Sequence, residues 1–167
     1  MTRAKWAAEL AEVARQVAAD LHATAEHRQQ RIVLCEPLAH GVRIPLPEPL
    51  ARVLLRNLLD NALRYSPEGA EVRLQVAEQD EGRAQLSVED SGPGLTPEEQ
   101  ARLGERFFRV LGTGQSGSGL GWSIVQRIAR LHHLQVRTDR SPALGGLRVT
   151  VRWQHSSDSP KAKMLHF

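Results

Sequence analysis

Three polar clusters, placed within or next to predicted helices and strands, constrain most strongly how this chain can fold. The first lies inside a predicted helix, the second follows a predicted strand, and the third opens another predicted helix. They are Asn57-Leu-Leu-Asp-Asn61-Ala-Leu-Arg64-Tyr65, Asp90-Ser-Gly92-Pro-Gly94 and Gly117-Ser118-Gly119-Leu120-Gly121. Amide side chains, a carboxylate and a glycine-rich helix start are together suited to a phosphorylated nucleotide. The fold is therefore expected to bring these segments together.

The composition indicates one globular domain. The 167 residues are 41% hydrophobic and 25% charged, which suffices for a buried core. The net charge is only +3, and the basic residues are scattered, so nucleic-acid binding is not expected. Cys35 is the only cysteine, which excludes an internal disulfide. No apolar run is long enough to span a bilayer. We expect a soluble domain over residues 1–155 and a disordered tail over 156–167.

Hydrophobic periodicity predicts the secondary structure. Helices are expected over residues 4–28, 50–65, 96–104 and 120–131. Strands are expected over 31–36, 41–45, 72–76, 84–88, 134–137 and 147–153. Thr96, followed by Pro97 and Glu99, has the form of a helix start. The order of these elements favours an α+β two-layer sandwich with the helices over one face of a sheet.

The amide cluster lies on one face of its helix. At 100° per residue, Asn57, Asn61 and Arg64 fall within an arc of roughly 60°. An Asn oxygen is a suitable ligand for Mg²⁺, and Arg64 could contact phosphates. Taken alone, these three residues fit a solvated helix face better than a binding site.

Asp90 ends an alternating strand and precedes two glycines, Gly92 and Gly94. The glycines allow the backbone to approach a flat ring closely. A carboxylate there can accept a hydrogen bond from the exocyclic amine of adenine, whereas guanine would present an oxygen. Taken alone, a surface turn explains the same residues equally well.

The glycines from Gly117 to Gly121 precede an apolar-periodic helix and offer free backbone amides to a triphosphate. A competing interpretation is a dinucleotide-binding fingerprint at Gly112-Thr-Gly114-Gln-Ser-Gly117, with Asp139 further on. That fold needs several strand and helix units after the glycines, and only fifty residues remain. It also leaves the other two clusters unexplained, so it ranks third among the hypotheses.

Four motifs in order resemble the asparagine, first glycine, phenylalanine and second glycine boxes of the ATP-binding catalytic domain of sensor histidine kinases. The third of these is Arg106-Phe107-Phe108-Arg109, and the others are the three polar clusters. The resemblance covers residues 50–153 and is strongest to QseC-type kinases.

The resemblance implies the Bergerat fold shared with gyrase, Hsp90 and MutL. This fold has a mixed, mostly antiparallel sheet of about five strands, with about three main helices on one face. It also implies the cofactors ATP and Mg²⁺, with Asn61 on Mg²⁺, Asp90 on adenine and Tyr65 near the base or ribose.

The rest of the implied binding set comes from the two later boxes. It consists of Phe107, Arg109, Gly117, Ser118, Gly119, Leu120 and Gly121, with 109–117 as a mobile lid. ATP-hydrolysing relatives have a Glu at the place of Asn57, and an amide cannot act as that base. Slow hydrolysis and transfer of the γ-phosphoryl group to a histidine are the expected chemistry, with Asn57, Asn61 and Arg64 in catalytic positions.

The chain departs from the family in three respects. No histidine is followed by the acidic residue and proline that mark a phosphoacceptor helix. The expected partners are therefore a separate dimerisation and phosphoacceptor domain and a response regulator, in the cytoplasmic part of a membrane-anchored parent. Trp122 stands where Leu is usual, and we interpret it as lid or core packing, while Leu147 stands where Thr is frequent. The second-ranked hypothesis is a nucleotide-binding regulatory module without phosphoryl transfer.

Overall fold

The computed structural model describes residues 7–35, 41–79, 82–94, 96–102 and 120–154. Its elements follow the chain in this order: β1 (Ala8–Glu9), α2 (Leu10–His27), β2 (Arg31–Leu34), β3 (Arg43–Ile44), α3 (Glu48–Tyr65), β4 (Glu71–Gln79), β5 (Arg83–Asp90), α4 (Pro97–Arg102), α5 (Leu120–Leu131), β6 (Gln135–Arg140) and β7 (Leu147–Gln154).

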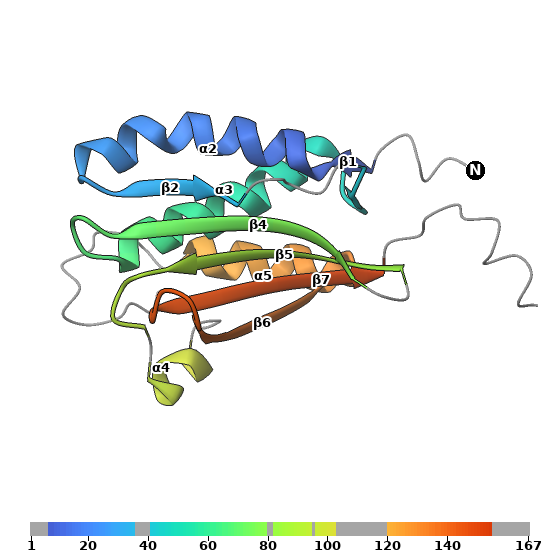
Figure 1. Cartoon of the computed structure of the whole chain (residues 1–167). Helices are drawn as coiled ribbons and strands as arrows, with labels where there is room; N and C mark the ends of the chain where they lie inside the picture. The colour runs from blue at the N-terminus through green and yellow to red at the C-terminus, as the bar shows by residue number, and fades with distance from the viewer. Residues whose placement is uncertain (1–6, 36–40, 80–81, 95, 103–119, 155–167) are drawn as a thin grey trace, which may run out of the picture.

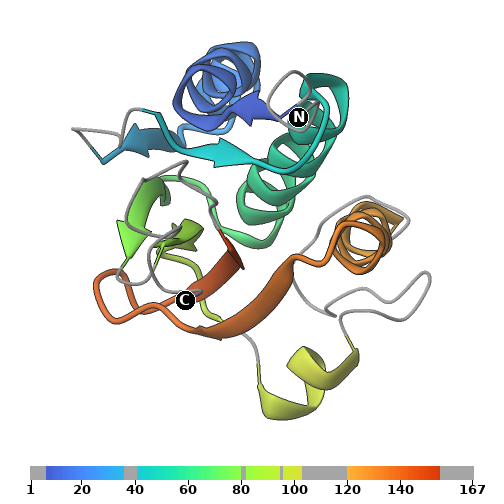
Figure 2. The ribbon, with the colours of Figure 1, turned by 90° about the vertical axis from the view of Figure 1, so that its right-hand side faces the viewer.

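The molecule has two layers. Five strands form one sheet in the order β2-β4-β5-β7-β6, and β1 and β3 form a separate two-stranded sheet. The β2–β4 pair is parallel and the other pairs of the large sheet are antiparallel. Helices α2, α3 and α5 lie on one face of this sheet, and α4 stands apart from them (Figures 1 and 2). The expected α+β two-layer sandwich is confirmed.

The core fills the space between the large sheet and its three helices. Alternate residues of the hairpin strands turn inward, as the period of two predicts. They are Val72, Leu74 and Val76 on β4 and Ala84, Leu86 and Val88 on β5. From α3 the buried residues include Leu54, Leu55, Leu58 and Leu59. Burial of these side chains is the main force that holds the layers together.

Helix α2 begins at Leu10, so the expected start near residue 4 was wrong. Ala8 and Glu9 are extended because they pair with β3, where Ala8 lies opposite Ile44. The Glu9 side chain then accepts a hydrogen bond from the Glu12 backbone N–H at 2.9 Å, which caps the first turn. Residues 4–6 lie outside the described residues.

The end of α3 is held by side chains that follow α2. Gln30 Nε2 donates to the carbonyls of Leu63 and Ser66 at 2.8 and 2.9 Å, and Arg28 Nη1 also donates to Leu63 at 2.7 Å. The last carbonyls of a helix have no partners within the helix, so these contacts satisfy them. They also fix the position of Tyr65, the last residue of α3.

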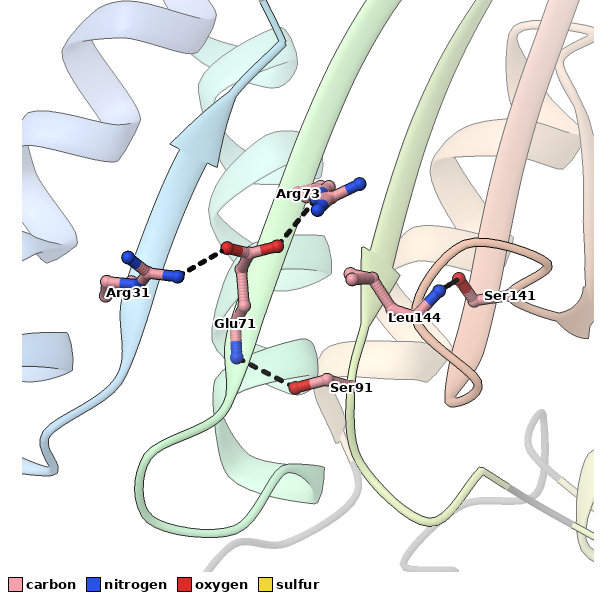
Figure 3. A network of polar contacts seen from close by, with 6 residues as sticks. All are labelled: Arg31, Glu71, Arg73, Ser91, Ser141 and Leu144. Atoms are coloured by element: carbon pink, nitrogen blue, oxygen red, sulfur yellow. Dashed lines mark hydrogen bonds and ion pairs between the residues drawn. The ribbon is translucent and has the colours of Figure 1, made fainter.

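Polar contacts brace the two loops at one end of the large sheet (Figure 3). On β4, Glu71 accepts from Arg31 at 2.8 Å and from Arg73 at 2.6 Å. The Glu71 backbone N–H donates to Ser91 Oγ at 2.9 Å, which extends the β4–β5 contact beyond Asp90. In the β6–β7 turn, the hydroxyl oxygen of Ser141 accepts from the Leu144 N–H. The residues around Asp90 are therefore fixed from two sides.

Helix α4 starts with the predicted cap. Thr96 Oγ1 accepts from the Glu99 N–H at 3.2 Å, and Glu99 Oε1 accepts from the Thr96 N–H at 3.0 Å. This reciprocal pair is a capping box. The expected lid over 109–117 and tail over 156–167 lie outside the described residues. Within the described ranges, no helix is both long and apolar enough to cross a membrane.

Candidate nucleotide-binding site

A pocket opens between α3, α5 and the strands β5 and β7. Its volume is about 320 Å³ including its open mouth. The lining residues are Leu58, Asn61, Ala62, Tyr65, Val88, Asp90, Trp122, Leu147 and Val149. A mostly apolar cavity with a few polar side chains is typical of small-molecule sites. Two of the three predicted clusters, represented by Asn61 and Asp90, thus meet in one cavity.

Asp90 lies at the end of β5 and is only 3% exposed. Its Oδ1 accepts hydrogen bonds from the backbone N–H groups of Gly92 and Leu147, at 3.0 and 3.2 Å. Within the described part of the chain, the hydrogen bonds to this carboxylate all end on Oδ1, so Oδ2 can accept from a ligand. Burial raises the pKa of the Asp90 carboxyl above its ordinary value, and the two backbone hydrogen bonds oppose that rise.

Gly146 is a site residue that the sequence interpretation missed. Its backbone N–H donates to the Asp90 carbonyl at 3.1 Å. A Cβ at position 146 would lie 2.2 Å from Asp90 Oδ1 and 2.3 Å from Asp90 O, so only glycine fits. The strands predicted over 134–137 and 147–153 left Gly146 in the segment between them, with no further role. Gly146 directly precedes Leu147, a position where the family frequently has Thr, and this neighbourhood was the signal that could have identified Gly146.

The asparagines meet the start of α5 beside the pocket. A Cβ on Gly121 would lie 2.9 Å from Asn57 Oδ1 and 3.1 Å from Asn61 Oδ1. Both amide oxygens therefore converge on the first turn of α5. Asn57 is oriented by its Nδ2, which donates to the Val53 carbonyl at 2.7 Å. The third cluster, as far as it is described, thus joins the other two.

The remaining predicted residues on α3 and after β5 have different positions. Tyr65 lines the pocket, whereas Arg64 Nε pairs with Asp60 Oδ2 at 3.1 Å along the helix. Gly92 passes close to the end of α3, since its Cβ would lie 3.1 Å from the Tyr65 carbonyl. Gly94 has a φ of 74° and faces the β6–β7 turn. Neither glycine lines the pocket.

Five predicted binding residues, Phe107, Arg109, Gly117, Ser118 and Gly119, lie outside the described residues. Leu120 is described only as the first residue of α5.

Trp122, on the first turn of α5, was interpreted as lid or core packing. It belongs to the buried core at 6% exposure, and it also lines the pocket. Its role in the pocket wall was not predicted, because the periodicity of α5 does not say which buried side chains border a cavity.

The side-chain oxygen atoms of the amide cluster are suitable ligands for Mg²⁺. The side-chain oxygens of Asn57 and Asn61 converge near Gly121, and uncharged oxygens are hard ligands that Mg²⁺ accepts together with water and phosphate. In the described ranges, no group of three His, Cys, Asp or Glu residues could hold a metal ion. A site completed by phosphate oxygens is therefore the arrangement that these residues can form.

Comparisons with known proteins identify the family to which the chain belongs. The model of the family described as "Histidine kinase-, DNA gyrase B-, and HSP90-like ATPase" matches residues 47–157. Sensor protein QseC of Escherichia coli strain K12 is 45% identical over 115 residues, which cover 69% of this chain and 24% of that protein. The chain thus spans about a quarter of the length of this curated relative.

Solved structures show the same fold. The mycobacterial sensor histidine kinase MprB superposes with a TM-score of 0.72 and 28% identity, covering 87% of this chain and 93% of that one. Full-length ShkA in complex with AMPPNP gives a TM-score of 0.74 and 26% identity, covering 92% of this chain and 31% of that one. The chain therefore belongs to the histidine kinase-, DNA gyrase B- and HSP90-like ATPase family, as an ATP-binding domain homologous to that of QseC-type sensor histidine kinases.

Proposed function

We propose that this chain binds Mg-ATP and positions the γ-phosphoryl group for transfer to a histidine on a separate dimerisation and phosphoacceptor domain. The observation that carries the proposal is the meeting of Asn61 and Asp90 in one pocket, with Asn57 and Gly121 beside it. A carboxylate at one end and amide oxygens at a helix start match the two ends of a nucleotide.

Asp90 selects adenine. Its Oδ1 is occupied by two backbone N–H groups, so Oδ2 is the atom that accepts from the exocyclic amine. Guanine presents a carbonyl oxygen at the corresponding position, and two acceptors facing each other in a buried site leave both without a donor. The apolar walls formed by Leu58, Val88 and Val149 enclose the ring.

The phosphates extend toward the amide cluster and the start of α5. Asn61 is the proposed Mg²⁺ ligand, Asn57 supports the same region, and Arg64 contacts the phosphates after leaving Asp60. When bound, Mg²⁺ would neutralise charge on the phosphate oxygens. Asn57 has no basic group that could take a proton from water, so hydrolysis is slow and the γ-phosphoryl group remains available for transfer.

The proposed partners follow from the lengths and names of the relatives. The chain covers 24% of the QseC sensor protein and 36% of the BasS sensor protein of Escherichia coli strain K12. The dimerisation and phosphoacceptor domain, the cognate response regulator and the cytoplasmic placement beneath a membrane-anchored sensor belong to the proposal for the parent protein.

A nucleotide titration tests the binding part of the proposal. Calorimetry with ATP, ADP, GTP and NAD, each with and without Mg²⁺, should show binding of ATP and ADP, strengthened by Mg²⁺, and much weaker binding of GTP. Preferred binding of NAD would support the dinucleotide hypothesis and contradict this one.

A transfer experiment separates the kinase from the second hypothesis, a regulatory module. The chain is mixed with ATP labelled at the γ-phosphate and a separately made QseC-type phosphoacceptor domain. Acid-labile label on the acceptor histidine is the expected result. The regulatory module would be favoured if the chain bound ATP but transferred no label to this acceptor domain, and none to an acceptor domain fused to the same chain.

A further inference from the structure

Two tryptophans are buried among the described residues, and their indole groups differ in hydrogen bonding. Trp153 is 5% exposed, and its Nε1 donates to the Arg43 carbonyl at 2.9 Å. Trp122 is 6% exposed, and its Nε1 has no hydrogen-bond partner within the described ranges. The same chain thus satisfies one buried indole and leaves the other unpaired.

An unpaired buried N–H group costs free energy, because it has lost its hydrogen bond to water. A phenylalanine or leucine would fill the position of Trp122 without that cost, so packing alone does not account for an indole. Trp122 borders the pocket, where a bound ligand can supply the missing acceptor. The unpaired N–H therefore points to a ligand contact.

The other polar groups of the pocket indicate which ligand atom is involved. Ionised Asp90 can only accept hydrogen bonds, so it takes the exocyclic amine of adenine. Two hydrogen-bond acceptors of the ring, N1 and N7, lie on either side of that amine. To pair either of them, the protein needs a donor beside Asp90. The side chain of Leu147 cannot donate, and its backbone N–H is bound to Asp90.

Two residues that line the pocket carry a buried donor without a partner, Asn61 with its Nδ2 and Trp122 with its Nε1. The amide of Asn61 has its oxygen turned toward Gly121 and Asn57, at the end of the site assigned to the phosphates. This leaves the indole for the base. We propose, on the basis of the ATP-binding function above, that Trp122 Nε1 donates a hydrogen bond to N1 or N7 of adenine and so acts as a second specificity determinant beside Asp90.

The first test compares Trp122→Phe with the wild-type chain by calorimetric titration with ADP. The variant keeps a ring but loses the N–H, so it should bind ADP roughly 2- to 13-fold more weakly, the range of one net hydrogen bond. Trp153→Phe is the matched control, since its indole bonds to Arg43 rather than to the pocket. It should lower the melting temperature and leave ADP affinity unchanged.

The second test identifies the acceptor with the 1-deaza, 7-deaza and 3-deaza analogues of ADP, each lacking one ring nitrogen. The wild-type chain should lose affinity for the 1-deaza or the 7-deaza analogue, and Trp122→Phe should show no further loss with that same analogue. The 3-deaza analogue is the control and should weaken both proteins equally. Independent, additive losses for all three analogues would overturn the proposal.

A spectroscopic measurement on the wild-type chain covers the case in which Trp122→Phe does not fold. Phe substitution at Trp6 and at Trp153 identifies the indole ¹⁵N–¹H resonances of those two residues. The remaining indole resonance belongs to Trp122. On addition of ADP it should shift downfield and exchange more slowly with water. An unchanged resonance, while ADP binds, overturns the role of Trp122 alone, whereas failure of the wild-type chain to bind ADP overturns the proposed function as well.

Discussion

The two ends of the pocket differ in how completely their polar groups are satisfied without a ligand. At the base end, the Asp90 carboxylate and carbonyl together accept three backbone hydrogen bonds, from Gly92, Leu147 and Gly146. At the end near α5, Asn61 Nδ2 is buried without a partner in the part of the chain that the structure describes. The Asp90 carboxylate is thus held in place without a ligand, whereas the N–H groups of Asn61 and Trp122 remain unpaired.

This difference separates the polar groups that are already in position from those that gain partners only when a ligand binds. A carboxylate held by backbone N–H groups needs no rearrangement to receive a base, so binding there loses little conformational entropy. The unpaired Asn61 N–H group near the helix start gains a hydrogen bond only when a phosphate is present, and the Asn61 oxygen gains a metal contact only when a cation is present. Changes at the base end should therefore affect all nucleotide binding, and changes at the amide cluster should affect its dependence on Mg²⁺.

The largest effect is expected for Gly146→Ala. The added Cβ would overlap Asp90 Oδ1 and O, so the backbone must move, at a cost of about 1–3 kcal/mol in the free energy of unfolding. ADP binding should be lost with it, as measured by calorimetry. Gly145→Ala is the matched control: it has a φ of 83° and open space, so alanine there strains the backbone but leaves Asp90 in place. Equal losses of binding in both variants would contradict the steric explanation.

Asp90→Asn should weaken ADP binding about 10- to 160-fold, because a hydrogen bond to a charged group contributes roughly 1.5–3 kcal/mol. The Asn oxygen can still accept from Gly92 and Leu147, so denaturant unfolding should show an intact fold. The discrimination between ATP and GTP should also fall. Near-normal affinity for ADP in a folded variant would remove Asp90 from the base site.

Asn61→Ala tests the amide cluster. The affinity for ADP in the presence of Mg²⁺ should fall about 10-fold, if the amide oxygen contributes as much as a hydrogen bond to a charged group, ~1.5 kcal/mol. The affinity measured with EDTA should change little. If the variant lost the same factor with and without Mg²⁺, Asn61 would contact the nucleotide and not the metal ion.

The smallest expected effect is a change in the free energy of unfolding with pH. The pKa of Asp90 is raised in the folded chain, chiefly by burial, so the folded state holds more protons than the unfolded state between the ordinary and the raised pKa. The free energy of unfolding should therefore fall as pH rises through that window, and remain lower above it. Asp90→Asn should lack this fall. Denaturant titrations of both proteins from acidic to neutral pH measure it, and parallel profiles would contradict the raised pKa.

Local patterns predicted most of the elements. The alternation in the β4–β5 hairpin, the capping box at Thr96 and Glu99, and the long helix ending at Tyr65 all follow from residues close in sequence. The amide face of α3 was predicted from 3.6-residue periodicity, and the structure brings both asparagine oxygens to Gly121. The elements, the cap and the amide face depend on contacts within a few residues, whereas the approach of the asparagines to Gly121 is a long-range contact.

Other features that depend on distant residues were missed. The start of α2 depends on the pairing of Ala8 with Ile44, and no local pattern encodes that partner. The approach of Gly146 to Asp90 joins positions that are far apart in the chain, so the local pattern placed Gly146 only in the segment between two predicted strands. Trp122 borders the pocket because of the way α5 packs on α3, which its own periodicity does not reveal.

The sequence by itself determined which side chains are available: an acid after a strand, two amides on one helix face, and glycines where a helix begins. It could do so because these choices are set by local backbone geometry. Only the tertiary structure decided that Leu147 and Gly146 hold Asp90 and that Trp122 closes the wall. Those contacts form when strands and helices pack, and close packing places groups with no local relation within hydrogen-bonding distance.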